Sequence, residues 1–294
     1  MARISLAEAH EKARWARHHY DSLGPEIDAF QKRGDHRITV EVDAERGEYV
    51  FRAFDLPTPD PDWGLRIGDC LHNARSALDY LMVRLYAVGT REDPKDIKTI
   101  QFPVCNTTKD FDNARTVKEF RKHRALSGYL ARIEELQPLN EHNPSIWGRS
   151  DPLTPSGRHA PVPLALSHLS AWDNIDKHRV IHATLVSGGV QLDRPPIPRE
   201  FRLTGERRTH DPLDEGAEIG GWHFETPLPF AWEPPEEDVR RYFPLEVSID
   251  LLLPPKAVLI VLPQCLRGVD EVLALFDPVF EDGRPPLPVT AISW

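Results

Sequence analysis

One stretch, GDCLHNARSALDYLMVRL at residues 68–85, constrains the fold more than any other part of the chain. On a repeat of 3.6 residues its side chains separate into a polar and an apolar stripe, as in a helix that packs on one face. The polar stripe holds Asp69, His72, Asn73, Ser76 and Tyr80, and the apolar stripe holds Ile67, Leu71, Ala74, Leu78, Leu81 and Leu85. Asp62 is a suitable N-cap and Gly89 a suitable stop, so we predict one helix over residues 63–88.

A second stretch of mixed character, WDNIDKHRVIH at residues 172–182, follows much later in the chain. Asn174, His178 and His182 are spaced i, i+4, i+8 on a helix predicted over residues 164–186, so they share one face. We expect the two helices to face each other and to build a polar pocket. The loop at residues 137–163 is too long for a simple connector, and we expect it to cover part of this pocket.

The remaining patterns predict a mainly α protein with an α+β C-terminal region. Two further helices are expected over residues 5–32 and 113–136. Residues 37–54 alternate with period two around a turn at 44–47, which predicts a β-hairpin inserted between helices.

After residue 188, proline pairs separate short alternating segments, which predict a small antiparallel sheet followed by a helix. The strands are expected at 200–203, 221–225, 245–253 and 257–262, and the helix at 264–280. The architecture is thus a helical bundle domain at residues 1–188, bearing the hairpin 37–54, and a small α+β region at residues 189–294.

The charge of the chain is unevenly distributed. The whole chain carries −10, but residues 205–282 carry −11, so the remainder is close to neutral and an anionic partner is not excluded. The concentrated basic residues are Arg115, Lys118, Arg121, Lys122, His123 and Arg124. They predict either a solvated helix face or a surface that contacts phosphates.

The two motifs together carry groups suited to metal-independent cleavage of RNA. RNA supplies its own nucleophile, so cleavage needs a base, an acid and a cation for the developing charge. The candidate catalytic residues are His72, Arg75, Asn174, Lys177 and His178. The candidate substrate-binding residues are Asn73, Arg179, Arg121, Lys122 and Arg124, with Asp69, Asp79 and Asp176 as supporting carboxylates. This chemistry needs no cofactor.

The segments HNARSALDYL and DNIDKHR resemble a motif pair of an uncharacterised bacterial and phage family, of the approximate form HNxRSALDxL and NxDKHR. The predicted helices over residues 5–186 are remotely similar to the HEPN superfamily of ribonucleases, toxins and nucleotide-binding domains. The resemblance implies a protein that binds or cleaves RNA or nucleotides in bacterial defence or a toxin–antitoxin pair. Tyr80 stands where HEPN nucleases carry a histidine, so a catalytic site would be shared between the two helices.

Two alternatives remain open. In the first, the polar stripes form a buried network in a non-enzymatic interaction or structural protein, with Arg75 paired to Asp79 and His72 bonded to a carboxylate. A homodimer or a protein partner belongs to this alternative. In the second, Asp69, His72, His178 and His182 hold a metal ion for a hydrolase, because histidine and carboxylate ligands on facing helices build such sites.

The composition excludes several other classes. No apolar run approaches the roughly 18 residues that span a bilayer, and the N-terminal segment lacks the apolar centre of a secretion signal, so we expect a cytoplasmic protein without a membrane partner. Three scattered cysteines fit a reducing compartment better than a disulfide framework. A Gly-rich phosphate loop and a nucleophile elbow are both missing from the sequence.

Overall fold

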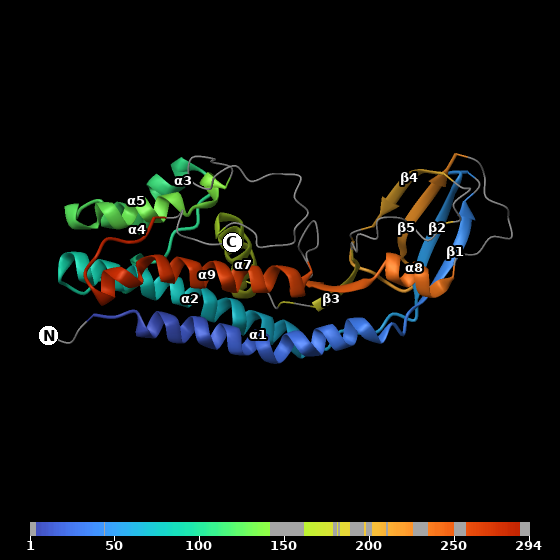
Figure 1. Ribbon diagram of the computed structural model, residues 1–294, viewed down its shortest axis with the longest axis horizontal. Coiled ribbons are helices and arrows are strands. Elements are labelled where there is room, and N and C mark those ends of the chain that lie inside the picture. Colours follow the sequence, from blue (N-terminus) through green and yellow to red (C-terminus); the bar gives the residue numbers. More distant parts are fainter. Residues whose placement is uncertain are drawn as a thin grey trace. The chain divides into compact units, whose positions relative to one another are not determined.

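The computed structural model describes residues 4–43, 45–141, 162–178, 181, 183–188, 197, 202–209, 211–225, 235–249 and 257–288. It confirms a mainly α fold with an α+β C-terminal region, including the hairpin and the closing helix (Figure 1). Within the described part of the chain, no helix is both long enough and apolar enough to cross a membrane.

The contacts between Cα atoms group the chain into two compact units, each assembled from separate segments. The first unit comprises Met1–Asp21, Arg66–Val180 and Val261–Trp294, and the second comprises Ser22–Leu65 and Ile181–Ile260. This division differs from the single boundary expected near residue 188. The reason is that the hairpin pairs with strands from the C-terminal part of the chain, which spacing along the sequence does not show.

The first unit is built on most of three helices, α1 (Ala7–Arg33), α2 (Asp62–Thr90) and α9 (Val258–Glu281) (Figure 1). The part of α1 from Ser22 onward and the first turns of α2 and α9 belong to the second unit. The start of α1 runs antiparallel to α9, because His10 pairs with Asp277 and Arg17, seven residues later, pairs with Asp270. It also runs antiparallel to α2, where Arg84 pairs with Glu8 and the Cys70 thiol donates to the Ala16 carbonyl, 3.1 Å away.

Small residues allow these helices to approach closely. Ala9, Ala13 and Ala16 of α1 are buried. Gly268 of α9 faces Ala165 of α7 (Val162–His178), and a Cβ atom at Gly268 would lie 2.6 Å from the Ala165 Cβ atom. Side chains of this size leave the backbones in contact, so the helix spacing depends on the missing methyl group.

The helix expected over residues 113–136 is wrong as a single element. The chain forms α3 (Thr108–Asn113), α4 (Arg115–Phe120) and α5 (Ser127–Glu135), with an extended residue, His123, before a 3₁₀ turn. The break lets His123 reach the Tyr86 hydroxyl, 3.3 Å away, and lets Leu126 fill the space left by Gly89 of α2. Tertiary packing therefore overrides the local helical period.

The second unit contains a four-stranded antiparallel sheet in the order β1-β2-β5-β4. The predicted hairpin is confirmed as β1 (Arg37–Asp43) and β2 (Glu48–Phe54). β2 pairs with β5 (Glu218–Phe224), which pairs with β4 (Leu203–Arg208) (Figure 1).

Aromatic packing covers one face of this sheet. The rings of Phe51 and Trp222 lie 4.4 Å apart between centroids, and Phe243 stacks on Trp222. Phe243 follows α8 (Glu236–Tyr242), and Gly220 leaves the room that its ring occupies. Burial of these large rings supplies much of the apolar area of the second unit.

Two predicted elements in the C-terminal half of the chain differ in the structure. The helix expected over residues 164–186 ends at His178, and residues 183–187 form β3 (Ala183–Ser187), paired with β6 (Leu245–Ile249). Of the strand expected at 257–262, Ala257 forms only an isolated bridge to Ser248, and residues 258–262 are the first part of α9. Short apolar runs fit a buried strand and a buried helix equally, so long-range pairing decides between them.

We predict that Gly268→Ala lowers the free energy of unfolding by about 1–2 kcal/mol, because the new methyl group collides with Ala165 and outweighs the gain in helix propensity. Gly128→Ala in α5 is the matched control, since nothing lies within 4 Å of its added Cβ atom. It should stabilise by about 0.5 kcal/mol. Urea unfolding measures both, and equal effects would contradict the close approach of α7 and α9.

Candidate functional site

Arg75 and Asp79, one turn apart on α2, both bind the backbone of Phe102. The Arg75 guanidinium donates to the Phe102 carbonyl, and the Asp79 carboxylate accepts the Phe102 N–H at 2.8 Å. Arg75 Nη2 also lies 3.5 Å from Asp79 Oδ1, so the two charges form a pair. Phe102 itself is 1% exposed, and its backbone groups therefore need these partners.

Two further side chains bind the backbone on either side of Phe102. The Thr116 hydroxyl accepts from the Gln101 N–H at 2.8 Å and lies within hydrogen-bond distance of the carbonyls of Thr99 and Gln101. Gln137 accepts from the Cys105 N–H at 3.0 Å. Residues 100–105 follow the 3₁₀ turn at Ile97–Thr99 and belong to no helix or strand, so side chains bind much of their backbone.

Burial raises the pKa of Asp79, although Arg75 and the Phe102 N–H both act to lower it. Arg75 is also well covered, with 13% of its side chain exposed, and its Nη1 atom has no hydrogen-bond acceptor among the described residues. Neither charge is well solvated, so each is stabilised mainly by the opposite charge of its partner.

The two motifs meet where Gly68 of α2 faces Asp176 of α7. A Cβ atom at Gly68 would overlap the Asp176 carboxylate, so this glycine creates the space for it. The pKa of Asp176 is raised, first by burial and then by the negative charges of Asp173 and Asp69, while His72 acts to lower it. His72 and Asp69 are both exposed. The structure thus brings Asp69, His72 and Asp176 together.

Asp173 is the most buried charged group of the second motif, at 2% exposure. Its Oδ2 atom pairs with Lys177 at 2.6 Å, one turn along α7. Its Oδ1 atom is buried, and no donor reaches it from the part of the chain that the structure describes. The neighbouring Asn174 is exposed. Lys177 is therefore already matched to a carboxylate.

The other candidate residues have different partners. Asn73 donates to the Asp69 carbonyl at 2.8 Å and accepts from Lys12 of α1 at 3.1 Å. On the basic surface, Arg121 pairs with Asp112 and Lys122 with Glu119, both at 2.5 Å.

Arg124 opens the 3₁₀ turn before α5. The side chain of His178, and all of Arg179 and His182, lie outside the described residues.

The metal site predicted as an alternative is only partly covered by the structure. Among the described residues, no group of three histidine, cysteine or carboxylate side chains could hold a metal ion. Of the four predicted ligands, Asp69 and His72 are among the described residues, whereas the His178 side chain and His182 are not. A metal ion shared by all four residues stays a prediction.

The residues that sequence reasoning missed are Thr116, Gln137 and the backbone of Phe102. Each bond to the extended segment joins residues at least 15 positions apart, so no local spacing indicates it. The Arg75–Asp79 spacing signalled a pair, but not that the pair would enclose a peptide backbone. No protein-family model, curated protein or solved structure matches the chain.

We predict that Arg75→Met lowers the free energy of unfolding by about 3 kcal/mol, because it leaves the Asp79 charge and the Phe102 carbonyl without their partner. Lys122→Ala, which breaks an exposed pair, should cost less than about 0.5 kcal/mol. Urea unfolding of both variants tests this, and a small effect of Arg75→Met would show that the contact with Phe102 is dispensable.

The raised pKa of Asp176 predicts a pH dependence of stability. Between about pH 3.9, where an unfolded aspartate titrates, and the higher pKa of the folded protein, the folded state binds more protons. The free energy of unfolding therefore falls as pH rises through this window. Asp176→Asn should gain stability relative to wild type over the same range, whereas Asp93→Asn, at an exposed position, should not. Chemical unfolding at several pH values provides the comparison.

Proposed function

We propose that this protein is a non-enzymatic interaction protein of the cytoplasm, in which the polar network around α2 maintains the fold. The observation that carries the proposal is the binding of both backbone groups of Phe102 by Arg75 and Asp79. These are the charged residues of the HNARSALD motif, and a structural task accounts for their type and their spacing.

The charges around His72 favour this proposal over phosphate chemistry. His72 lies near the Asp176 carboxylate, on which Asp69 and Asp173 also act as negative charges, and Lys177 is paired with Asp173. Stabilising a phosphate in a transition state requires a cation aimed at the developing charge. The Arg75 guanidinium is bound to the Phe102 carbonyl through Nη2 and is buried at Nη1, so it is committed to the fold.

We expect purified wild-type protein to leave total RNA intact, with or without a chelator, and Arg75→Met to change only stability. RNA is incubated with wild type, His72→Ala and His178→Ala, and the products are resolved by electrophoresis. Cleavage by wild type that either histidine variant abolishes would refute the proposal. Cleavage that persists equally in both variants would come from a contaminating nuclease.

The runner-up proposal is a HEPN-like protein that binds or cleaves RNA or nucleotides in bacterial defence. The specific support is that the two motifs meet, with exposed His72 near Asp176 and exposed Asn174 on the same helix as Asp176. This proposal predicts that RNA binding weakens in His72→Ala and falls with rising salt. Salt-dependent filter binding of single-stranded RNA tests it, and binding that is equal in wild type and His72→Ala would remove His72 from the interface.

A further inference from the structure

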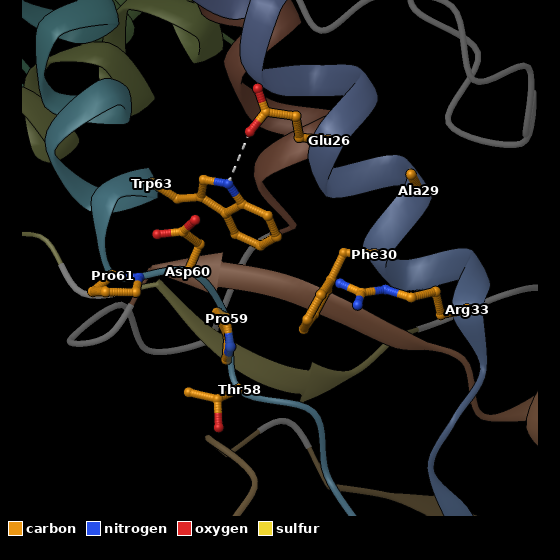
Figure 2. Close-up of a pocket in the computed structure, with 9 residues that line it drawn as sticks. All are labelled: Glu26, Ala29, Phe30, Arg33, Thr58, Pro59, Asp60, Pro61 and Trp63. Atoms are coloured by element: carbon orange, nitrogen blue, oxygen red, sulfur yellow. Dashed lines mark hydrogen bonds between the residues drawn. The ribbon is translucent and has the colours of Figure 1, made fainter.

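A hollow of about 750 Å³ lies within the second unit (Figure 2). It shares no residue with the group of Asp69, His72, Asp173 and Asp176. One wall is the C-terminal half of α1, and the other is the segment before α2 with the first turn of α2. The lining residues are Glu26, Ala29, Phe30, Arg33, Thr58, Pro59, Asp60, Pro61 and Trp63. A cavity of this size, with an apolar base and a few convergent polar groups, has the character of a ligand site.

Three side chains of α1 form a row along this hollow. Glu26, Phe30 and Arg33 are spaced i, i+4, i+7, so they share one face of the helix. Seven residues rise about 10 Å along a helix axis, which separates the carboxylate end of the row from the guanidinium end by two turns. Phe30 lies between the two charges.

The base of the hollow is a rigid aromatic pair. Phe30 and Trp63 meet edge to face, with their ring centroids 5.1 Å apart. Both side chains are nearly buried, so their positions are set by packing. Pro59 and Pro61 form the opposite wall (Figure 2). The accessible apolar surface of the hollow therefore comes from Ala29, Pro59 and Pro61, and one side chain of a ligand can pack against it.

Arg33 supplies a cation whose donors are available. Its guanidinium lies over the Phe30 ring, 4.9 Å from the centroid, which orients the plane of the group. No carboxylate pairs with it anywhere in the described ranges, whereas its neighbour Lys32 pairs with Asp28. A stacked guanidinium with free donors is suited to a carboxylate ligand, which it can bind through two hydrogen bonds.

The other end of the row is acidic. Glu26 lies beside the Trp63 indole, whose N–H donates to its carboxylate at 3.4 Å (Figure 2). Asp60 lies on the facing segment, and the Asp62 N–H fixes its carboxylate at 2.9 Å. The two carboxylates make this end of the hollow attractive to an ammonium group.

We propose that this hollow binds a short, extended peptide with free ends. Its carboxylate binds Arg33, its amino group binds at Glu26 and Asp60, and its central side chain packs against Ala29, Pro59 and Pro61 beside the Phe30–Trp63 pair. An extended chain spans about 3.5 Å per residue, so three residues match the separation of the charged ends. Single amino acids are too short to reach both ends.

The test titrates full-length protein with the tripeptide Ala-Phe-Ala in four forms: free, N-acetylated, C-amidated and capped at both ends. Binding is followed through the indole N–H signal of Trp63, assigned with Trp63→Phe. The free peptide should bind best, and each cap should weaken binding about tenfold, as expected for one charge-assisted contact.

Variants separate the two charged ends. Arg33→Gln should weaken the free and N-acetylated peptides about tenfold but leave the C-amidated peptide unchanged. Glu26→Gln should weaken the free and C-amidated peptides and leave the N-acetylated peptide unchanged. Lys32→Gln on the same turn is the control and should change nothing, because Lys32 pairs with Asp28 outside the hollow.

Three results would overturn the proposal: no saturable shift of the Trp63 signal, equal affinity for the free and doubly capped peptides, or an equal loss in Lys32→Gln and Arg33→Gln. Lys32 and Arg33 are exposed, so their variants should fold as wild type, which thermal melting by circular dichroism verifies.

Discussion

Every buried backbone N–H and C=O group needs a hydrogen-bond partner, and residues 99–105 meet this requirement without a neighbouring strand. Arg75 and Asp79 bind Phe102, while Thr116 and Gln137 bind Gln101 and Cys105. The charged residues Arg75 and Asp79 of α2 are therefore explained by the segment that they bind. Without these side chains the segment would bury several unpaired groups, each at a cost of about 1–3 kcal/mol.

The residues of the polar stripe of α2 contact other neighbours along the helix. Asn73 bonds to Lys12 of α1, and Asp69 and His72 lie near Asp176 of α7, in the space that Gly68 creates. Polar side chains of α2 thus contact α1, α7 and the segment around Phe102. The close approaches at Gly68 and Gly268 show that shape, as much as charge, determines which side chains meet.

These contacts separate two kinds of polar residue. Arg75 and Asp79 are covered and committed to the backbone, whereas His72 and Asn174 are exposed and available to a ligand. Among the described residues, His72 lies near the Asp176 carboxylate, on which Asp69 and Asp173 act as further negative charges. In the second unit, the hollow beside Phe30 and Trp63 has a cation, Arg33, that pairs with no carboxylate of the described residues, and carboxylates at its other end, an arrangement suited to a zwitterion rather than to a nucleic acid.

The sequence by itself determined the elements whose signals are local: the helix over residues 63–88, the hairpin at 37–54 and the separation of α2 into two stripes. Period and turn chemistry act over a few residues, so one sequence suffices to detect them. Only the tertiary structure decided that residues 183–187 form a strand, that residues 258–262 begin a helix and that Arg75 binds Phe102. Those outcomes depend on partners far along the chain, whose burial and hydrogen-bond requirements no local pattern encodes.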